Sequence, residues 1–225
     1  MTTRKNITSM IAMIVFGCIA MAYVDAVIMP DYAVKSMIKF VLFLTLPLVY
    51  CLINREVSFR SLFKLEKKGL IFSILLGVGV YVLIMGSYML IGPMLDLSQV
   101  TESLQNNIGV NADNFLYVAI YISIVNSLLE EFFFRGFAFL SLKKLTGRKF
   151  AYIFSAGAFA VYHIAMMTSW FTVPLFLLLI TSLFIAGLLF NWLNERNGNI
   201  YASWMVHMFA NLAINTIGFI LFGLI

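Results

Sequence analysis

Long apolar stretches alternate with short polar connections along the whole chain. Seven of these stretches approach or exceed the roughly 20 residues that a helix needs to cross a membrane. We therefore predict seven membrane-spanning helices, at residues 7–29, 37–53, 70–91, 115–142, 150–170, 173–193 and 200–225. The fourth stretch is long enough for its helix to break after the charged residues that it contains.

Composition supports the same fold class. Of the 225 residues, 62% are hydrophobic and 11% are charged, whereas a soluble domain is about 25% charged. We predict an all-α, polytopic bundle that forms one integral membrane domain. Within this domain, residues 1–114 supply the N-terminal helices, and residues 115–225 supply a core that carries the polar motifs.

The placement of basic residues predicts the topology. Twelve of the fifteen Lys and Arg residues fall at the N-terminus and in the second, fourth and sixth connections. Lys35 and Lys39 are assigned to the opposite side, and Arg135 lies in the membrane. The positive-inside rule then predicts a multi-pass protein of the cell membrane with a cytoplasmic N-terminus and an external C-terminus. The net charge of +5 follows from this topology and indicates no nucleic-acid partner.

Two connections differ in character. The connection at residues 93–114 is polar and has no Lys or Arg, but it contains Asp96, Glu102 and Asp113. The basic connection after the second helix has apolar residues spaced for an amphipathic turn on the membrane surface: Phe59, Leu62, Phe63 and Leu65. A solvated basic loop is the alternative interpretation of this second connection.

Three charged residues lie inside the fourth apolar stretch. Each ionised side chain costs roughly 2.5–3.5 kcal/mol at the centre of a membrane helix, so such a cluster indicates a functional site. Glu131 and Arg135 are four residues apart and can pair. Glu130 points about 100° away and has no cation nearby in its helix, which makes it the candidate general base. A buried ion network that only locks helices together is the alternative.

The chain has two histidines, and both lie in predicted helices. His163 follows Phe159 by four residues, and His207 is followed after one turn by Asn211. Each histidine alone is also compatible with a simple hydrogen bond between helices. At 1.5 Å per residue, however, Glu131, His163 and His207 lie about 17, 20 and 10 Å from the inner ends of their helices. We therefore predict that these groups converge on one cavity that opens toward the inner leaflet or the cytoplasm.

Such a cavity has the groups that amide hydrolysis requires, namely a base to activate water and donors to hold the oxyanion. Glu130 is the candidate base, and His163 can orient the water or return a proton. His207 and Asn211 are the candidate oxyanion donors. The sequence requires no cofactor, and the His-Glu-x-x-His pattern of many zinc proteases is missing. A split site for a divalent metal such as zinc, held by Glu130, His163 and His207, stays open.

Three patterns occur in order in separate hydrophobic helices: Glu130-Glu131-x-x-x-Arg135, Phe159-x-x-x-His163 and His207-x-x-x-Asn211. Together they resemble the CPBP (Abi) family of intramembrane proteases. That family includes CAAX prenyl endoproteases and proteins linked to bacteriocin processing and immunity. The resemblance covers about residues 115–212, whereas the first three helices match only in being hydrophobic.

The resemblance implies a glutamate-based endopeptidase in which Glu130 and His163 activate water and His207 and Asn211 form the oxyanion site. Glu131, Arg135 and Phe159 are then structural supports of that site. The expected partners are a peptide or protein substrate at the membrane and the lipid bilayer. Two other functions stay open from the residues: a non-catalytic bacteriocin immunity or binding protein on the same scaffold, and an ion or proton carrier with the glutamate and histidines as a relay.

Overall fold

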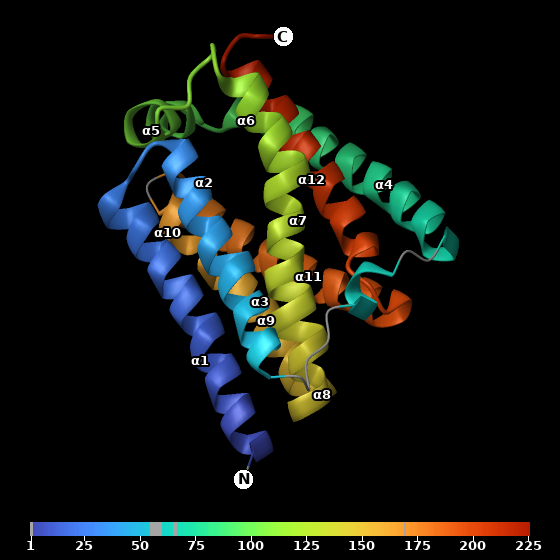
Figure 1. The fold of residues 1–225 in the computed structure, drawn as a ribbon. Helices are drawn as coiled ribbons and strands as arrows, with labels where there is room; N and C mark the ends of the chain where they lie inside the picture. The colour runs from blue at the N-terminus through green and yellow to red at the C-terminus, as the bar shows by residue number, and fades with distance from the viewer. Residues whose placement is uncertain (1, 55–59, 65–66, 169) are drawn as a thin grey trace.

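The computed structural model describes residues 2–54, 60–64, 67–168 and 170–225, and the regular structure in these ranges is entirely helical (Figure 1). Seven helices are long and apolar enough to cross a membrane: Asn6–Ile28, Tyr32–Ile53, Gly69–Met94, Phe115–Thr146, Arg148–Met167, Val173–Asn197 and Tyr201–Leu221. The all-α fold and the seven predicted spans are thus confirmed, with ends that differ by a few residues.

Among the described residues, π-helical segments of 5 to 11 residues form part of several of these spans. The first span consists of α1 (Thr2–Tyr23) and the π-helical η1 (Val24–Ile28). The second consists of α2 (Tyr32–Phe40), η2 (Val41–Thr45) and α3 (Leu46–Ile53). The fourth is α6 (Phe115–Tyr121), η5 (Ile122–Asn126), α7 (Ser127–Glu130), η6 (Glu131–Ser141) and α8 (Leu142–Thr146). The fourth span therefore changes its winding after Glu130 but does not break.

The remaining elements follow a simpler pattern. They are the short η3 (Arg60–Phe63), the long α4 (Lys67–Ile91), η4 (Gly92–Met94) and α5 (Ser98–Ile108) in the first half. The second half adds α9 (Arg148–Tyr162), α10 (Ile164–Met167), α11 (Val173–Asn197) and α12 (Tyr201–Leu221). The connection at residues 93–114 thus contains a helix, α5, that its polar sequence did not predict. Leu104 and Ile108 of α5 pack against a small apolar cluster around Phe115, which stabilises the helix.

The fourth span runs through the length of the bundle (Figure 1). The helices α1 and α2 lie on one side of it, whereas α4 and α12 lie on the other. Its segment η6 is buried at every position, and phenylalanine rings fill the surrounding core. Phe43 of η2 stacks on Phe133 with ring centroids 4.1 Å apart. Glu130, Glu131 and Arg135 therefore lie in the interior of the protein, away from lipid.

Close helix contacts hold this arrangement. A Cβ atom at Gly187 of α11 would lie 2.9 Å from the Cα atom of Ala156 in α9. The two helices thus approach backbone to backbone, as small residues permit between membrane helices. This contact brings α9, which ends next to His163, against α11.

The part of the basic connection that the structure describes packs against the bundle. Leu62 is buried beside Phe132 and Ile200, and the backbone amide of Ile200 donates a hydrogen bond to its carbonyl oxygen at 3.1 Å. The prediction that Leu62 belongs to a turn on the membrane surface is therefore wrong, because its side chain fills a gap in the protein core. Phe59 and Leu65 of the predicted turn lie outside the described residues.

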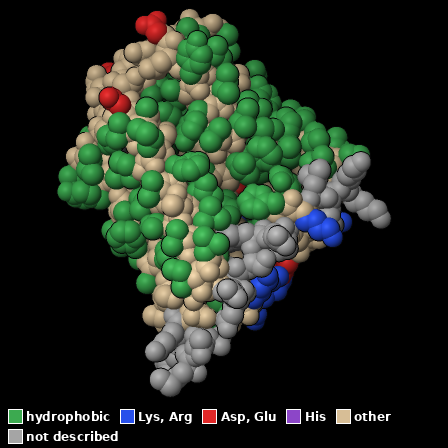
Figure 2. All heavy atoms as spheres, viewed as in Figure 1, with side chains coloured by type: hydrophobic (Ala, Val, Ile, Leu, Met, Phe, Trp, Pro, Cys, Tyr) green, Lys and Arg blue, Asp and Glu red, His purple; other side chains and the backbone are tan. Residues whose placement is uncertain are grey.

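The surface matches a membrane environment. Hydrophobic side chains cover most of the height of the face in Figure 2, whereas Lys and Arg side chains gather near one end. Acidic side chains stand out at the opposite end of the same view. The N- and C-termini lie at opposite ends of the bundle (Figure 1), as an odd number of spans requires.

Candidate active site

Glu130 is buried at the centre of a small polar network. One of its carboxylate oxygens, Oε1, lies 2.5 Å from Lys39 Nζ and accepts a hydrogen bond of 3.1 Å from Asn126 Nδ2. Lys39 also donates to Asn126 Oδ1 at 2.6 Å. Asn126 and Glu130 are one helical turn apart, while Lys39 reaches them from α2. Among the described residues, Glu130 has no cation partner in its own helix, as the sequence predicts, but a buried lysine from another helix pairs with it.

The second carboxylate oxygen, Oε2, faces both histidines. It lies 3.9 Å from His163 Nε2 and 3.7 Å from His207 Nε2. These separations are too long for direct hydrogen bonds, but each is a length that one bridging water can span. The structure thus brings together three residues that the sequence placed in separate helices.

His163 is oriented by its own helix. Its Nδ1 lies 2.7 Å from the carbonyl oxygen of Phe159, and a carbonyl oxygen can only accept, so Nδ1 carries a proton. The other ring nitrogen, Nε2, then faces Glu130 and acts as an acceptor when the ring is neutral. The pattern Phe159-x-x-x-His163 has a structural meaning here, because the residue at position 159 supplies the carbonyl that fixes the ring.

His207 is oriented by Glu131. Its Nδ1 lies 2.9 Å from Glu131 Oε1, so the ring donates from Nδ1 and turns Nε2 toward Glu130. The ring also stacks on Phe190 with centroids 5.4 Å apart. A carboxylate behind a histidine fixes both the orientation and the tautomer of the ring. Glu131 therefore contacts the candidate site directly, in addition to its pairing within the helix.

Arg135 has an unusual environment. Its side chain is fully buried, and its Nε lies 3.5 Å from Glu131 Oε2. Its guanidinium carbon lies 4.0 Å from the ring centre of Phe159 and 4.8 Å from that of Phe190. Among the residues that the structure describes, none accepts a hydrogen bond from its nitrogens. Glu131 and the faces of two aromatic rings therefore balance this buried charge.

Asn211 is placed differently from the other predicted site residues. Its Nδ2 donates to the carbonyl oxygen of Ile122 in η5 at 3.1 Å. Within the described ranges, no hydrogen bond links Asn211 to Glu130, His163 or His207. One of its two amide protons is thus engaged with the backbone of the fourth span. Its role as an oxyanion donor stays a prediction.

Sequence reasoning missed two residues of the site, Asn126 and Lys39. The topology prediction counted Lys39, together with Lys35, as a charge on the outer side of the membrane. In the structure both lysines are buried. Lys35 pairs with Asp25 at 2.5 Å, and Lys39 pairs with Glu130. The sequence did contain a signal for Lys39. This residue lies within the predicted span 37–53, and a charged side chain inside a membrane span requires a partner.

The donor set gives limited support for a metal. Among the described residues, no group of three or more His, Cys, Asp or Glu side chains has the spacing of a metal site. The ammonium group of Lys39 on Glu130 Oε1 also competes with a cation for the same carboxylate. Metal binding by Glu130, His163 and His207 therefore stays a prediction, and no step of the chemistry below depends on it.

The fold and the site together define a polytopic helical membrane protein with a glutamate and two histidines converging in its interior. Residues 112–213 match a family model named Rce1-like, whose description is type II CAAX prenyl endopeptidase Rce1-like. This match confirms the resemblance to CPBP-type membrane proteases, and it covers just under half of the chain, including all three motifs. A search of curated proteins and a search of solved structures each return no match.

Proposed function

We propose that the protein is an intramembrane endopeptidase that hydrolyses a peptide bond of a membrane-associated peptide or protein with water activated by Glu130. The observation that carries the proposal is the position of Glu130 Oε2, which lies 3.9 Å from one histidine and 3.7 Å from the other in the protein interior. The family match supports the same reaction class, because type II CAAX prenyl endopeptidases are proteases.

In this mechanism, Glu130 takes a proton from a water held between its Oε2 and the histidines. The hydroxide adds to the carbonyl carbon of the substrate and forms a tetrahedral intermediate. His207, with protons on both ring nitrogens, donates from Nε2 to the developing oxyanion, while Glu131 stabilises the positive charge on its ring. The second amide proton of Asn211 supplies a further donor. The carbon–nitrogen bond then breaks, and Glu130 passes its proton to the leaving amine, so that an acid and an amine are released.

Lys39 has a positioning role in this proposal. It engages Glu130 Oε1 together with Asn126, which leaves Oε2 turned toward the histidines. A carboxylate without this contact can rotate, and a displacement of about 1 Å can cost a factor of about 10² in rate.

We expect Lys39→Met to lower kcat about tenfold to a hundredfold, with little change in KM. Lys39→Arg should restore part of the loss, because it returns a cation to the same place. Lys35→Met is the matched control, since it breaks a buried ion pair on the same helix away from Glu130. The measurement is peptide cleavage per folded molecule in detergent. If Lys39→Met and Lys35→Met lower kcat equally, Lys39 acts only by stabilising the fold.

The cellular substrate is best found by comparing protein N-termini in three strains, which carry the wild-type gene, no gene, or the Glu130→Gln variant. We expect one or more new N-termini in the wild-type strain alone. If the Glu130→Gln strain behaves as the wild type in every respect, catalysis is not the function, and the non-catalytic immunity or binding role is favoured instead.

We further propose that the N-terminus is cytoplasmic and the C-terminus external in the cell membrane, as the distribution of basic residues indicates. Cys18 and Cys51 are both free thiols and can be replaced by alanine to give a background without cysteine. In intact cells, a cysteine at exposed position Gln105 should then react with a membrane-impermeant maleimide. A cysteine at exposed position Lys144 should react only after the cells are opened. The reverse pattern would invert the orientation.

A further inference from the structure

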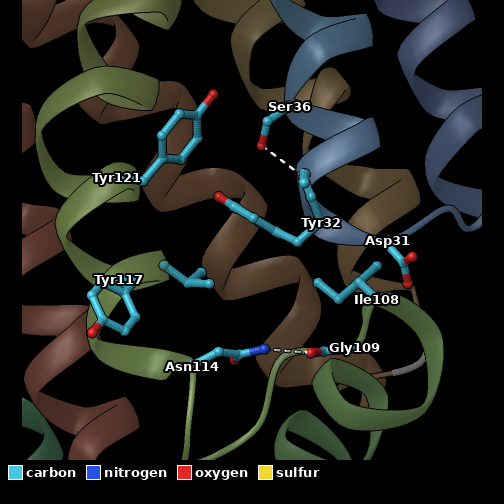
Figure 3. Close-up of a pocket in the computed structure, with 10 residues that line it drawn as sticks. Asp31, Tyr32, Ser36, Ile108, Gly109, Asn114, Tyr117 and Tyr121 are labelled. Carbon is cyan, nitrogen blue, oxygen red and sulfur yellow. Dashed lines mark hydrogen bonds between the residues drawn. The ribbon is translucent and has the colours of Figure 1, made fainter.

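A cavity of about 560 Å³ lies between the start of α2, the end of α5 and the helix α6 (Figure 3). This volume falls in the range of small-ligand sites. The cavity is at the end of the bundle where the C-terminus lies, opposite α8 and the N-terminus (Figure 1). The predicted site residues do not line it. The opening of the predicted site cavity toward the inner leaflet or the cytoplasm is a separate matter and stays a prediction.

Three tyrosines give the cavity its chemical character. Tyr32 projects from α2 across the space toward α6, which contributes Tyr117 and Tyr121 (Figure 3). The rings of Tyr32 and Tyr121 meet edge to face, with centroids 5.8 Å apart. Aromatic rings that surround a space in this way attract cations through their electron-rich faces.

Asp31 adds a negative charge at the same cavity. It precedes α2, where an aspartate commonly caps the helix, yet its side chain makes no capping hydrogen bond. Its carboxylate is exposed and forms no ion pair with any described residue. The nearby Lys35 does not neutralise it, because Lys35 is buried against Asp25. One carboxylate residue and three tyrosines thus line the same cavity.

The surroundings reinforce this charge. The connection at residues 93–114 contains three acidic residues and no Lys or Arg. One of them, Asp96, accepts two hydrogen bonds from Ser98, which lower the pKa of its carboxyl group, so it stays ionised at neutral pH. A surface of one sign raises the local concentration of ligands of the opposite sign.

Two of the helices that line the cavity, α2 and the fourth span, also carry residues of the candidate active site. On α2, Tyr32 and Ser36 share a face with Lys39, which lies about 4.5 Å further along the axis than Ser36. On the fourth span, Glu130 lies nine residues beyond Tyr121, or about 13 Å. An extended peptide advances about 3.3 Å per residue. A group in the cavity therefore lies about two to four residues from a bond held at Glu130.

We infer that this cavity binds the cationic side chain of a peptide, a lysine or an arginine, two to four residues from the bond to be cut. The inference rests on the proposed function only for the place of cleavage, because binding of the cation requires no catalysis. It assigns to the enzyme a preference for basic peptides that approach from the end of the bundle opposite its basic connections.

The test uses two dansylated decapeptides of alanine and glutamine, one with a single central lysine and one with norleucine in its place. Each is titrated to 1 mM into the wild-type protein in phosphatidylcholine nanodiscs, with empty nanodiscs as the blank. We expect the lysine peptide to bind about tenfold more tightly. Asp31→Asn and Tyr121→Leu should each reduce this preference at least threefold. Mass spectrometry of the recovered peptides reports any cleavage in the same samples.

Matched controls lie outside the cavity. Asp96→Asn removes a carboxylate at the same end and should reduce the lysine preference less than Asp31→Asn does. Tyr23→Leu removes an exposed tyrosine from α1 and should leave the preference unchanged. The inference is overturned if the lysine peptide does not bind, if both peptides bind equally, or if the cavity variants keep the full preference. A lysine preference without cleavage of any basic peptide would count against the proposed function alone. Cleavage without the preference would count against the cavity alone.

Discussion

Glu130→Gln is expected to lower the rate of peptide hydrolysis per folded molecule by a factor of roughly 10² or more. Glutamine keeps the shape of the side chain and accepts hydrogen bonds, but it cannot take a proton from water. Because Oε2 of Glu130 is the atom that faces both histidines, no other carboxylate replaces it. Glu131 is engaged by His207 and Arg135 and points elsewhere.

The same variant should also be less stable. From the sequence alone, Glu130 has no ion-pair partner in its own helix, so its replacement by glutamine would leave the fold nearly unchanged. The structure corrects this expectation, because Glu130→Gln leaves the buried ammonium of Lys39 without its anion. Breaking a buried pair from one side costs roughly 3–5 kcal/mol. The double variant with Lys39→Met removes both charges, so it should regain part of the melting temperature without regaining activity.

These variants are measured side by side after purification in detergent, with the melting temperature and the cleavage rate taken on the same preparations. Normalising the rate to the folded fraction separates the two effects. If Glu130→Gln still cleaves at the wild-type rate per folded molecule, Glu130 is not the base. If the double variant is active, the same conclusion follows even where the single variant fails to fold.

The parts of this structure that depend on local pattern were predictable. Hydrophobic length gave all seven spans, and the four-residue spacing gave the pair of Glu131 and Arg135. The convergence of Glu130, His163 and His207 was also expected, because polar groups at membrane depth must find one another. Helix depth and the cost of burying charge carry this information, and both can be read from a sequence.

The parts that depend on helix rotation were not predictable. Lys39 and Glu130 are 91 residues apart, and only the packing of α2 against the fourth span brings them together. The π-helical turns of that span add a residue to a turn, which shifts every later side chain around the axis. They also direct the carbonyl of Ile122 to Asn211, an arrangement that no helical spacing reveals. The cavity beside α5 depends on a helix that the polar connection did not predict.

Glu131→Gln is the second variant with a large expected effect, and stability should dominate it. Arg135 is fully buried, and Glu131 is its one ion-pair partner among the described residues. Removing that anion leaves the guanidinium with the faces of Phe134, Phe159 and Phe190. We expect a loss of roughly 3–5 kcal/mol in the free energy of unfolding, seen as a large drop in melting temperature. This loss should match or exceed that of Glu130→Gln.

The double variant Glu131→Gln with Arg135→Met then separates the two roles of Glu131. Without the buried cation, it should recover part of the stability. It should not recover the rate, because glutamine can accept the hydrogen bond from His207 Nδ1 but cannot stabilise a positive charge on the ring. The cleavage rate per folded molecule should therefore stay about tenfold or more below the wild type. A double variant that regains both stability and rate would show that Glu131 only balances Arg135, and that His207 acts without a charged partner.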